Sequence, residues 1–111
     1  MKMIVAIVQP QQLPDIKDAL QAAGFDDMTC TNILGTVANQ HEEYKYRGAS
    51  QEITLFQKLR IEIGVNDEQV QDAVDALSAG AIKSGGAGIA FITELFECIE
   101  LRTGARGTAI L

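Results

Sequence analysis

Apolar residues follow strand and helix periods in turn along the chain. Residues 2–8 are apolar at odd and even positions alike, which is typical of a strand covered on both faces. From Asp15 the apolar positions recur at helical spacing, Pro14 suits the first helical turn, and Gly24 suits the position just after the helix. Residues 28–34, rich in Thr and Ile, predict a second strand.

The second half of the chain repeats this order. Residues 55–65 alternate apolar and polar positions and predict the strongest strand. The polar face of this strand has three charged residues, namely Lys58, Arg60 and Glu62. Asn66 is a predicted helix N-cap, and the apolar stripe after it ends near Gly80. Residues 78–88 are small and rich in glycine and predict a loop, and residues 89–101 predict a long final strand.

This order of elements predicts an α+β fold, the ferredoxin-like βαββαβ sandwich, in which two helices cover one face of an antiparallel sheet. Right-handed crossovers place the first and third strands in the centre of the sheet. The face without helices also has apolar residues, because the first strand is apolar on both sides. We therefore expect further copies of the chain to cover that face.

One segment, residues 35–54, follows neither period. It contains the only His and both Tyr residues of the chain. A loop of about 20 residues is rare in a compact domain, and long loops tend to be functional or disordered. We expect an arm that contacts a partner or responds to a ligand, and a plain hairpin connection is the alternative.

Length and charge restrict the classes of function. The 111 residues predict a single domain over residues 1–111, and the net charge of −6 argues against a nucleic-acid-binding surface. No apolar run reaches the roughly 18 residues of a membrane span, and the N-terminus does not resemble a secretory signal, so we expect a cytoplasmic protein.

Few residues could perform catalysis. His41, beside Glu42 and Glu43, makes at most a weak metal triplet and no triad, so we predict no enzyme, no catalytic residues and no metal site. Cys30 and Cys98 are predicted to be buried or half-buried on opposite edge strands, too far apart for a disulfide.

The glycine-rich residues 84–88 could offer N–H groups to a phosphate or carboxylate. They are not a P-loop, because the Lys and hydroxyl that end that motif are missing. A simple turn between a helix and a strand is the alternative.

The chain resembles the PII signal-transduction family over essentially its whole length. The matching stretches are MKMIVAI with Pro10, TNILG ending at Gly35, YRGA at 46–49, KLRIEIGV at 58–65, the glycine turn before Phe91, and RTG at 102–104. The resemblance implies a homotrimer whose sheets face inward, with adenine nucleotides bound in the clefts between subunits. It also identifies residues 35–54 as the T-loop, 82–89 as the B-loop, and 102–111 as the C-terminal loop and tail.

The resemblance further implies roles for individual positions. The base would be surrounded by Ile7, Thr29, Glu62, Ile63 and Gly64, and the cleft edged by Gly35, Thr36 and Val37. The phosphates would be bound by the N–H groups of Gly86, Ala87 and Gly88, with charge from Arg102 across the interface, and Lys58 would also belong to the nucleotide site. A small anion such as bicarbonate would lie near Asn39, Gln40, Arg47 and Lys58. A target protein, often a membrane transporter in this family, would contact Tyr44, Tyr46 and Arg47.

Several positions depart from the nitrogen-sensing pattern. Ile89 replaces a phosphate-binding Lys, and Glu100 replaces the first of two arginines. Asn39 stands where a Gln holds magnesium beside 2-oxoglutarate, and Gln51 and Ala49 stand where other members are covalently modified. Loss of two cations weakens triphosphate binding by about 10²–10⁴-fold. We therefore predict a side branch of the family that favours ADP or AMP over MgATP, in the manner of the carboxysome-associated, bicarbonate-responsive members.

Two alternatives remain open. One is a nitrogen regulator that senses ATP and 2-oxoglutarate and uses Gln40, Lys83 and Arg106 as substitute ligands. The other is a metal- or redox-responsive ferredoxin-like trimer that uses His41, Glu42, Glu43 and the two cysteines.

Overall fold

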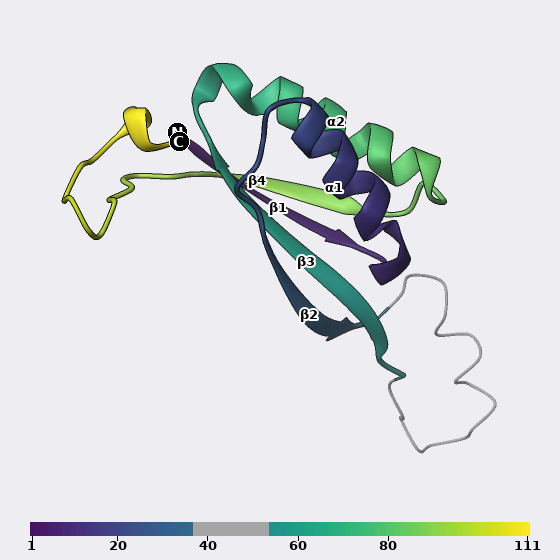
Figure 1. Cartoon of the computed structure of the whole chain (residues 1–111). Helices are drawn as coiled ribbons and strands as arrows, with labels where there is room; N and C mark the ends of the chain where they lie inside the picture. The colour runs from purple at the N-terminus through teal and green to yellow at the C-terminus, as the bar shows by residue number, and fades with distance from the viewer. Residues whose placement is uncertain (37–53) are drawn as a thin grey trace.

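The computed structural model describes residues 1–36 and 54–111, which form one antiparallel sheet with two helices on one face (Figure 1). The strands are β1 (Lys2–Val8), β2 (Thr29–Gly35), β3 (Phe56–Val65) and β4 (Ile89–Glu94). The helices are α1 (Leu13–Ala22) and α2 (Val70–Lys83), each preceded by a short 3-10 turn, Pro10–Gln12 and Asp67–Gln69. A third such turn, Thr108–Ile110, lies near the C-terminus.

The strand order β2-β3-β1-β4 places the first and third strands in the centre, so the predicted ferredoxin-like fold is confirmed. Ile4 of β1 lies opposite Ile63 of β3 and Ile92 of β4, which fixes the register of the sheet. Alternate residues of β1 and β3 pack against the helices. The buried core consists of Ile4, Ala6, Val8, Ile16, Leu20, Phe25, Leu59, Ile61, Ile63, Val65, Ala73, Ala76 and Leu77.

The predicted end of the second helix at Gly80 is wrong, because α2 continues to Lys83. Gly80 is buried inside the helix, where an added Cβ atom would lie 2.5 Å from the Cα atom of Ile16. Glycine at this position therefore lets α1 and α2 approach closely instead of ending α2. The helix ends where Gly86, with a φ of +83°, donates its N–H to the Ala81 carbonyl at 2.6 Å.

The predicted strand over residues 89–101 is also too long. Pairing of β4 with β1 reaches Lys2, the first residue of β1, at Glu94, and β4 ends there. Figure 1 shows the rest of the chain looping away from the sheet and returning to it, where Leu111 lies against Gly64 of β3. Phe96 and Leu101, whose apolar character suggested a strand, are 94% and 93% exposed.

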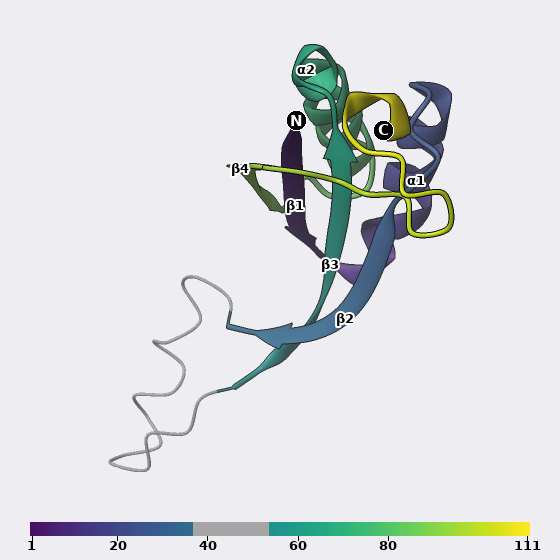
Figure 2. The ribbon, with the colours of Figure 1, turned by 90° about the vertical axis from the view of Figure 1, so that its left-hand side faces the viewer.

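Within residues 1–36 and 54–111, no helix covers the second face of the sheet (Figure 2). We call it the open face. Its apolar half consists of half-buried or exposed residues of β1 and β4, namely Met3, Val5, Ile7, Ile89 and Phe91. Its polar half lies on β3 and includes Lys58, Arg60 and Glu62. The prediction that the helices leave one partly apolar face uncovered is therefore confirmed.

Two smaller predictions need correction. Cys30 is exposed on β2, and half-buried Cys98 lies beyond β4, not on an edge strand; both thiols are free. Asn66 is the N-cap residue of the 3-10 turn before α2, as predicted, but its side chain makes no capping hydrogen bond. The Gln69 side chain accepts the Asn66 N–H at 3.2 Å, whereas the buried Asn66 Oδ1 has no partner among the described residues.

Candidate ligand-binding site

A cavity of about 370 Å³ lies on the open face, where β1 ends and β3 begins. We call it the Lys58 cavity. It is lined by Ile7, Val8, Gln9, Pro10, Gln11, Phe56, Gln57, Lys58, Ala87, Gly88 and Ile89. The fold thus brings together residues from β1, β3 and the glycine-rich loop that are far apart in sequence. Four of the predicted ligand residues, Ile7, Lys58, Ala87 and Gly88, line this one cavity.

The glycine-rich loop, residues 84–88, forms one wall of the cavity. The Gly86 N–H is used to end α2, so it is not available to a ligand in this conformation. The N–H groups of Ala87 and Gly88 have no hydrogen-bond acceptor within residues 1–36 and 54–111. Gly88 has a φ of +149° and lies against β1, since an added Cβ atom would be 3.1 Å from Val8 Cγ1. Glycine is therefore needed here for both backbone shape and close approach.

Gln12 holds this loop, a contact that the local sequence does not indicate. Its side chain is fully buried and is the one buried polar side chain in the described part of the chain. Its Nε2 donates to the carbonyls of Ala87, at 2.7 Å, and Ala81, at 3.3 Å. Its Oε1 accepts the Gln9 N–H at 2.8 Å. Gln12 lies among several polar residues before an amphipathic helix, where a solvent-facing side chain would be expected.

Lys58 links the cavity to the end of β2. Its Nζ donates to the Thr36 carbonyl, and its aliphatic part lies over Gly35, where an added Cβ atom would be 3.2 Å from Lys58 Cδ. Gly35 and Thr36, which the resemblance places at the edge of a ligand cleft, therefore lie beside Lys58. The other residues predicted in this segment lie outside the described residues: Val37, Asn39, Gln40, His41, Glu42, Glu43, Tyr44, Tyr46, Arg47, Ala49 and Gln51.

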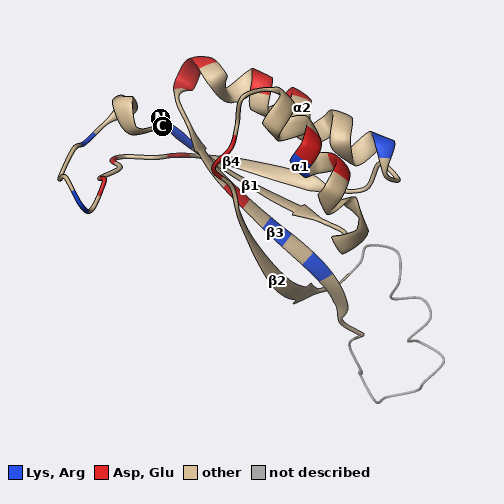
Figure 3. Ribbon diagram, viewed as in Figure 1, with Lys and Arg blue, Asp and Glu red and all other residues tan. Residues whose placement is uncertain are grey.

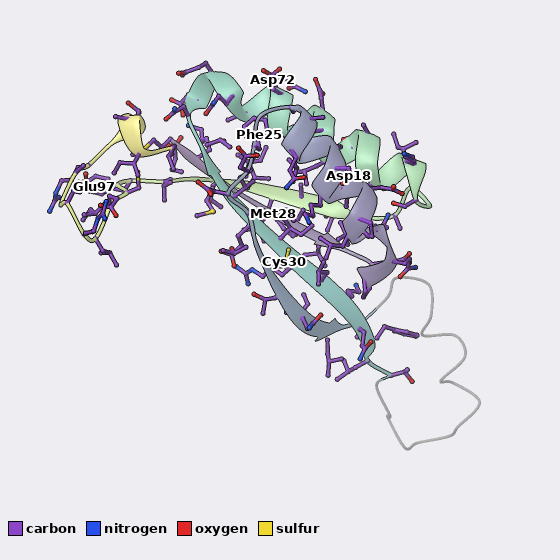
Figure 4. The ribbon with its side chains drawn as sticks, viewed as in Figure 1. Asp18, Phe25, Met28, Cys30, Asp72 and Glu97 are labelled. Carbon is purple, nitrogen blue, oxygen red and sulfur yellow. The ribbon has the colours of Figure 1, made fainter. Side chains whose placement is uncertain are left out.

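A second cavity, of about 360 Å³, lies at the opposite end of the open face. We call it the Thr29 cavity. It is lined by Met3, Asp26, Asp27, Met28, Thr29, Glu62 and Gly64. Figure 4 places Met28 and Cys30 at the beginning of β2. Three residues predicted to surround a base, Thr29, Glu62 and Gly64, meet here, whereas the buried Ile63 side chain points into the core.

The two cavities differ in charge. Cationic residues lie along β3 (Figure 3), namely Lys58 and Arg60, and Arg60 Nε is 3.2 Å from Glu62 Oε1. The Lys58 cavity has a lysine and unpaired backbone N–H groups, which suit an anion. The Thr29 cavity has the carboxylates of Asp26, Asp27 and Glu62, which accept hydrogen bonds from amino groups.

The positions that depart from the nitrogen-sensing pattern lie as follows. Ile89 is 56% exposed on the wall of the Lys58 cavity, so it adds apolar surface where a cation could reach a phosphate. Arg102 is exposed and lines neither cavity of the single chain. The Glu100 carboxylate accepts the Thr103 hydroxyl at 2.7 Å and the Thr103 N–H at 2.8 Å, and these hydrogen bonds lower the pKa of Glu100.

The substitute ligands considered for a triphosphate are paired elsewhere. Lys83 Nζ is 3.9 Å from Asp15 Oδ1, and Arg106 Nη1 is 3.3 Å from Glu97 Oε2. Neither residue lines the Lys58 cavity. Within residues 1–36 and 54–111, no three His, Cys, Asp or Glu residues are grouped to hold a metal ion, and no helix is long and apolar enough to span a membrane.

Comparison with known proteins agrees with this fold. The sequence model of the family described as nitrogen regulatory protein P-II matches residues 1–105. The nitrogen regulatory protein P-II 2 of Methanothermobacter thermautotrophicus is 40% identical, over 96% of this chain and 94% of that protein. The nitrogen regulatory protein GlnK of Escherichia coli is 30% identical over the full length of both chains. The P-II protein of Cereibacter sphaeroides is 36% identical over 96% of each. The chain therefore belongs to the P-II family of regulatory proteins.

Proposed function

We propose that this protein is a non-enzymatic, trimeric signalling protein that binds adenine nucleotides between its subunits. The nucleotide state would be passed to a target protein through residues 35–54. The observation that supports the proposal best is the pair of cavities on the open face. One presents a lysine and backbone N–H groups suited to phosphates, and the other presents carboxylates suited to the amino group of a base.

The two cavities lie at opposite ends of a sheet face that neither α1 nor α2 covers, and this placement suits sites shared between subunits. In a cyclic trimer, each subunit contacts its neighbours through two different patches. The Lys58 cavity of one subunit would then face the Thr29 cavity of the next.

The chemistry of the Lys58 cavity favours ADP or AMP over MgATP. Lys58 and the N–H groups of Ala87 and Gly88 remain for the first phosphates. Ile89 provides no cation, and the Glu100 carboxylate is held by Thr103. Each missing charged hydrogen bond weakens binding by about 1.5–3 kcal/mol. A small anion such as bicarbonate would bind beside Lys58.

Calorimetric titration of the purified protein tests this proposal. AMP, ADP and MgATP are each titrated alone, with bicarbonate and with 2-oxoglutarate. We expect ADP or AMP to bind at least about tenfold more tightly than MgATP, and bicarbonate to strengthen that binding. Tight MgATP binding that needs 2-oxoglutarate would instead establish an ATP- and 2-oxoglutarate-sensing nitrogen regulator. No binding of any nucleotide would contradict the proposal.

A further inference from the structure

We propose that Gln12 is a positioning residue that fixes the phosphate-binding shape of residues 84–88 from behind the Lys58 cavity. This inference rests on the nucleotide function proposed above. The side chain does not line the cavity, so it would act on a nucleotide only through the backbone that it holds. It connects two walls of that cavity, because it accepts the Gln9 N–H on one side and donates to the Ala87 carbonyl on the other.

The orientation of one peptide group follows from this contact. The Ala87 carbonyl points toward Gln12 Nε2 at 2.7 Å. A trans peptide is planar, so the Gly88 N–H of the same peptide group points the opposite way, away from Gln12. That N–H has no acceptor within the described residues, and Gly88 lines the Lys58 cavity. Gln12 thus determines which way a cavity-lining donor faces.

The loop needs such a constraint because its own backbone provides little. Gly85, Gly86 and Gly88 all have positive φ values, between +83° and +149°. Glycine lacks a Cβ atom, so Gly88 offers little steric resistance to rotation of the Ala87–Gly88 peptide plane. Gln12 also donates to the Ala81 carbonyl, which accepts the Gly86 N–H as well, so the same side chain joins the end of α2 to the loop.

Two variants separate this role from a general effect on folding. Gln12→Glu keeps the acceptor for Gln9 but replaces the donor that faces Ala87, and Gln12→Met removes both functions at similar length. Gln21→Glu is the matched control, because it makes the same change at an exposed position of the adjoining helix. Each variant is titrated with ADP and with adenosine, which lacks phosphates.

We expect both Gln12 variants to bind ADP about tenfold more weakly, with adenosine affinity unchanged within about twofold. The Gln21→Glu protein should match the wild type with both ligands. Equal loss of ADP and adenosine affinity, or no loss of either, would overturn the role of Gln12. If the wild-type protein itself fails to bind ADP, the proposed function fails, and the inference fails with it.

A measurement on the wild-type protein covers the case in which neither variant folds. The side-chain amide of Gln12 is buried and donates two hydrogen bonds, so its protons should be observable by NMR and should exchange slowly with solvent. ADP should shift these signals, because phosphates that bind the Gly88 N–H would polarise the Ala87–Gly88 peptide whose carbonyl accepts from Gln12. Adenosine, which lacks phosphates, should not shift them. Signals that respond equally to both ligands, or to neither, would contradict the inference.

Discussion

At the scale of single residues, position 89 tests the ligand preference most directly. Ile89 lies on the wall of the Lys58 cavity beside Gly88. We predict that Ile89→Lys raises MgATP affinity by about 10- to 150-fold, the equivalent of one charged hydrogen bond worth 1.5–3 kcal/mol. Calorimetry measures the change. Ile89→Met, which keeps the apolar character, should leave the affinity near that of the wild type. Equal effects of the two substitutions would show that charge at this position is not the cause.

Glu100 gives a prediction about pH. The hydroxyl of Thr103, followed by its N–H, lowers the pKa of Glu100. Because the pKa is lower in the folded state, the stabilisation of the turn at 100–104 is present above the unfolded value of about 4.3 and is lost as pH falls through the folded pKa. In an NMR titration, Thr103→Val should move the Glu100 pKa back toward its usual value. Thr108→Val, at an exposed threonine outside this turn, should leave it unchanged.

The sequence predicted the charged and glycine-rich positions that line the cavity better than the buried residue that contacts the glycine-rich loop from the core. Lys58, Ala87 and Gly88 do line one cavity, because charge and glycine content mark such positions directly. Gln12 was missed, since burial of an amide depends on carbonyl groups about 70 positions away that local sequence does not reveal. Arg102, which was predicted to reach the cleft from a neighbouring subunit, lines neither cavity of its own chain.

At the scale of elements, Gly80 sets the distance between α1 and α2. A Cβ atom there would lie 2.5 Å from Ile16 Cα and 2.9 Å from the Asp15 carbonyl oxygen, both in backbone that cannot rotate aside. Alanine favours a helix over glycine by about 1 kcal/mol, but overpacking of this kind costs about 1–3 kcal/mol. We therefore predict that Gly80→Ala lowers the free energy of unfolding, measured with urea.

Ser78→Ala is the control for this prediction, because Ser78 is exposed two residues earlier in the same helix. Its free energy of unfolding should stay within about 0.5 kcal/mol of the wild type at equal protein concentration. A Gly80→Ala protein as stable as the Ser78→Ala protein would mean that the two helices separate without loss of packing.

Element boundaries show what local patterns cannot predict. Glycine at position 80 suggested a helix end, but its role is tertiary, in contact with α1. Apolar residues after Glu94 suggested a continuing strand. The pairing of β4 with β1 ends at Glu94, because Glu94 is already opposite Lys2, the first residue of β1. In both cases contact with another element, α1 for Gly80 and β1 for β4, explains the observed structure. The number, type and order of the strands and helices could be predicted, because those depend on periodicity within each segment.

At the scale of the whole molecule, the open face connects the fold to the proposed function. Val5 and Phe91 are paired neighbours on this face, and neither α1 nor α2 covers them. Apolar surface of this kind is usually covered by another chain. The Lys58 and Thr29 cavities lie at opposite ends of the same face, so the assembly that covers the apolar half would also complete the ligand sites.

Mixed trimers can test whether each site combines two subunits. Lys58→Glu places a carboxylate that repels phosphates in the Lys58 cavity, and Thr29→Trp fills the Thr29 cavity with a bulky side chain. Thr31→Trp, on the same strand and outside both cavities, is the control for the bulky side chain.

Each defective protein alone should lose ADP binding by calorimetry. When the two are refolded together in equal amounts, about one quarter of the clefts would pair an intact Lys58 cavity with an intact Thr29 cavity, because a cyclic trimer joins different patches of neighbouring subunits. ADP binding should therefore return at about a quarter of the wild-type stoichiometry. If both halves of a site belonged to one chain, mixing would restore nothing.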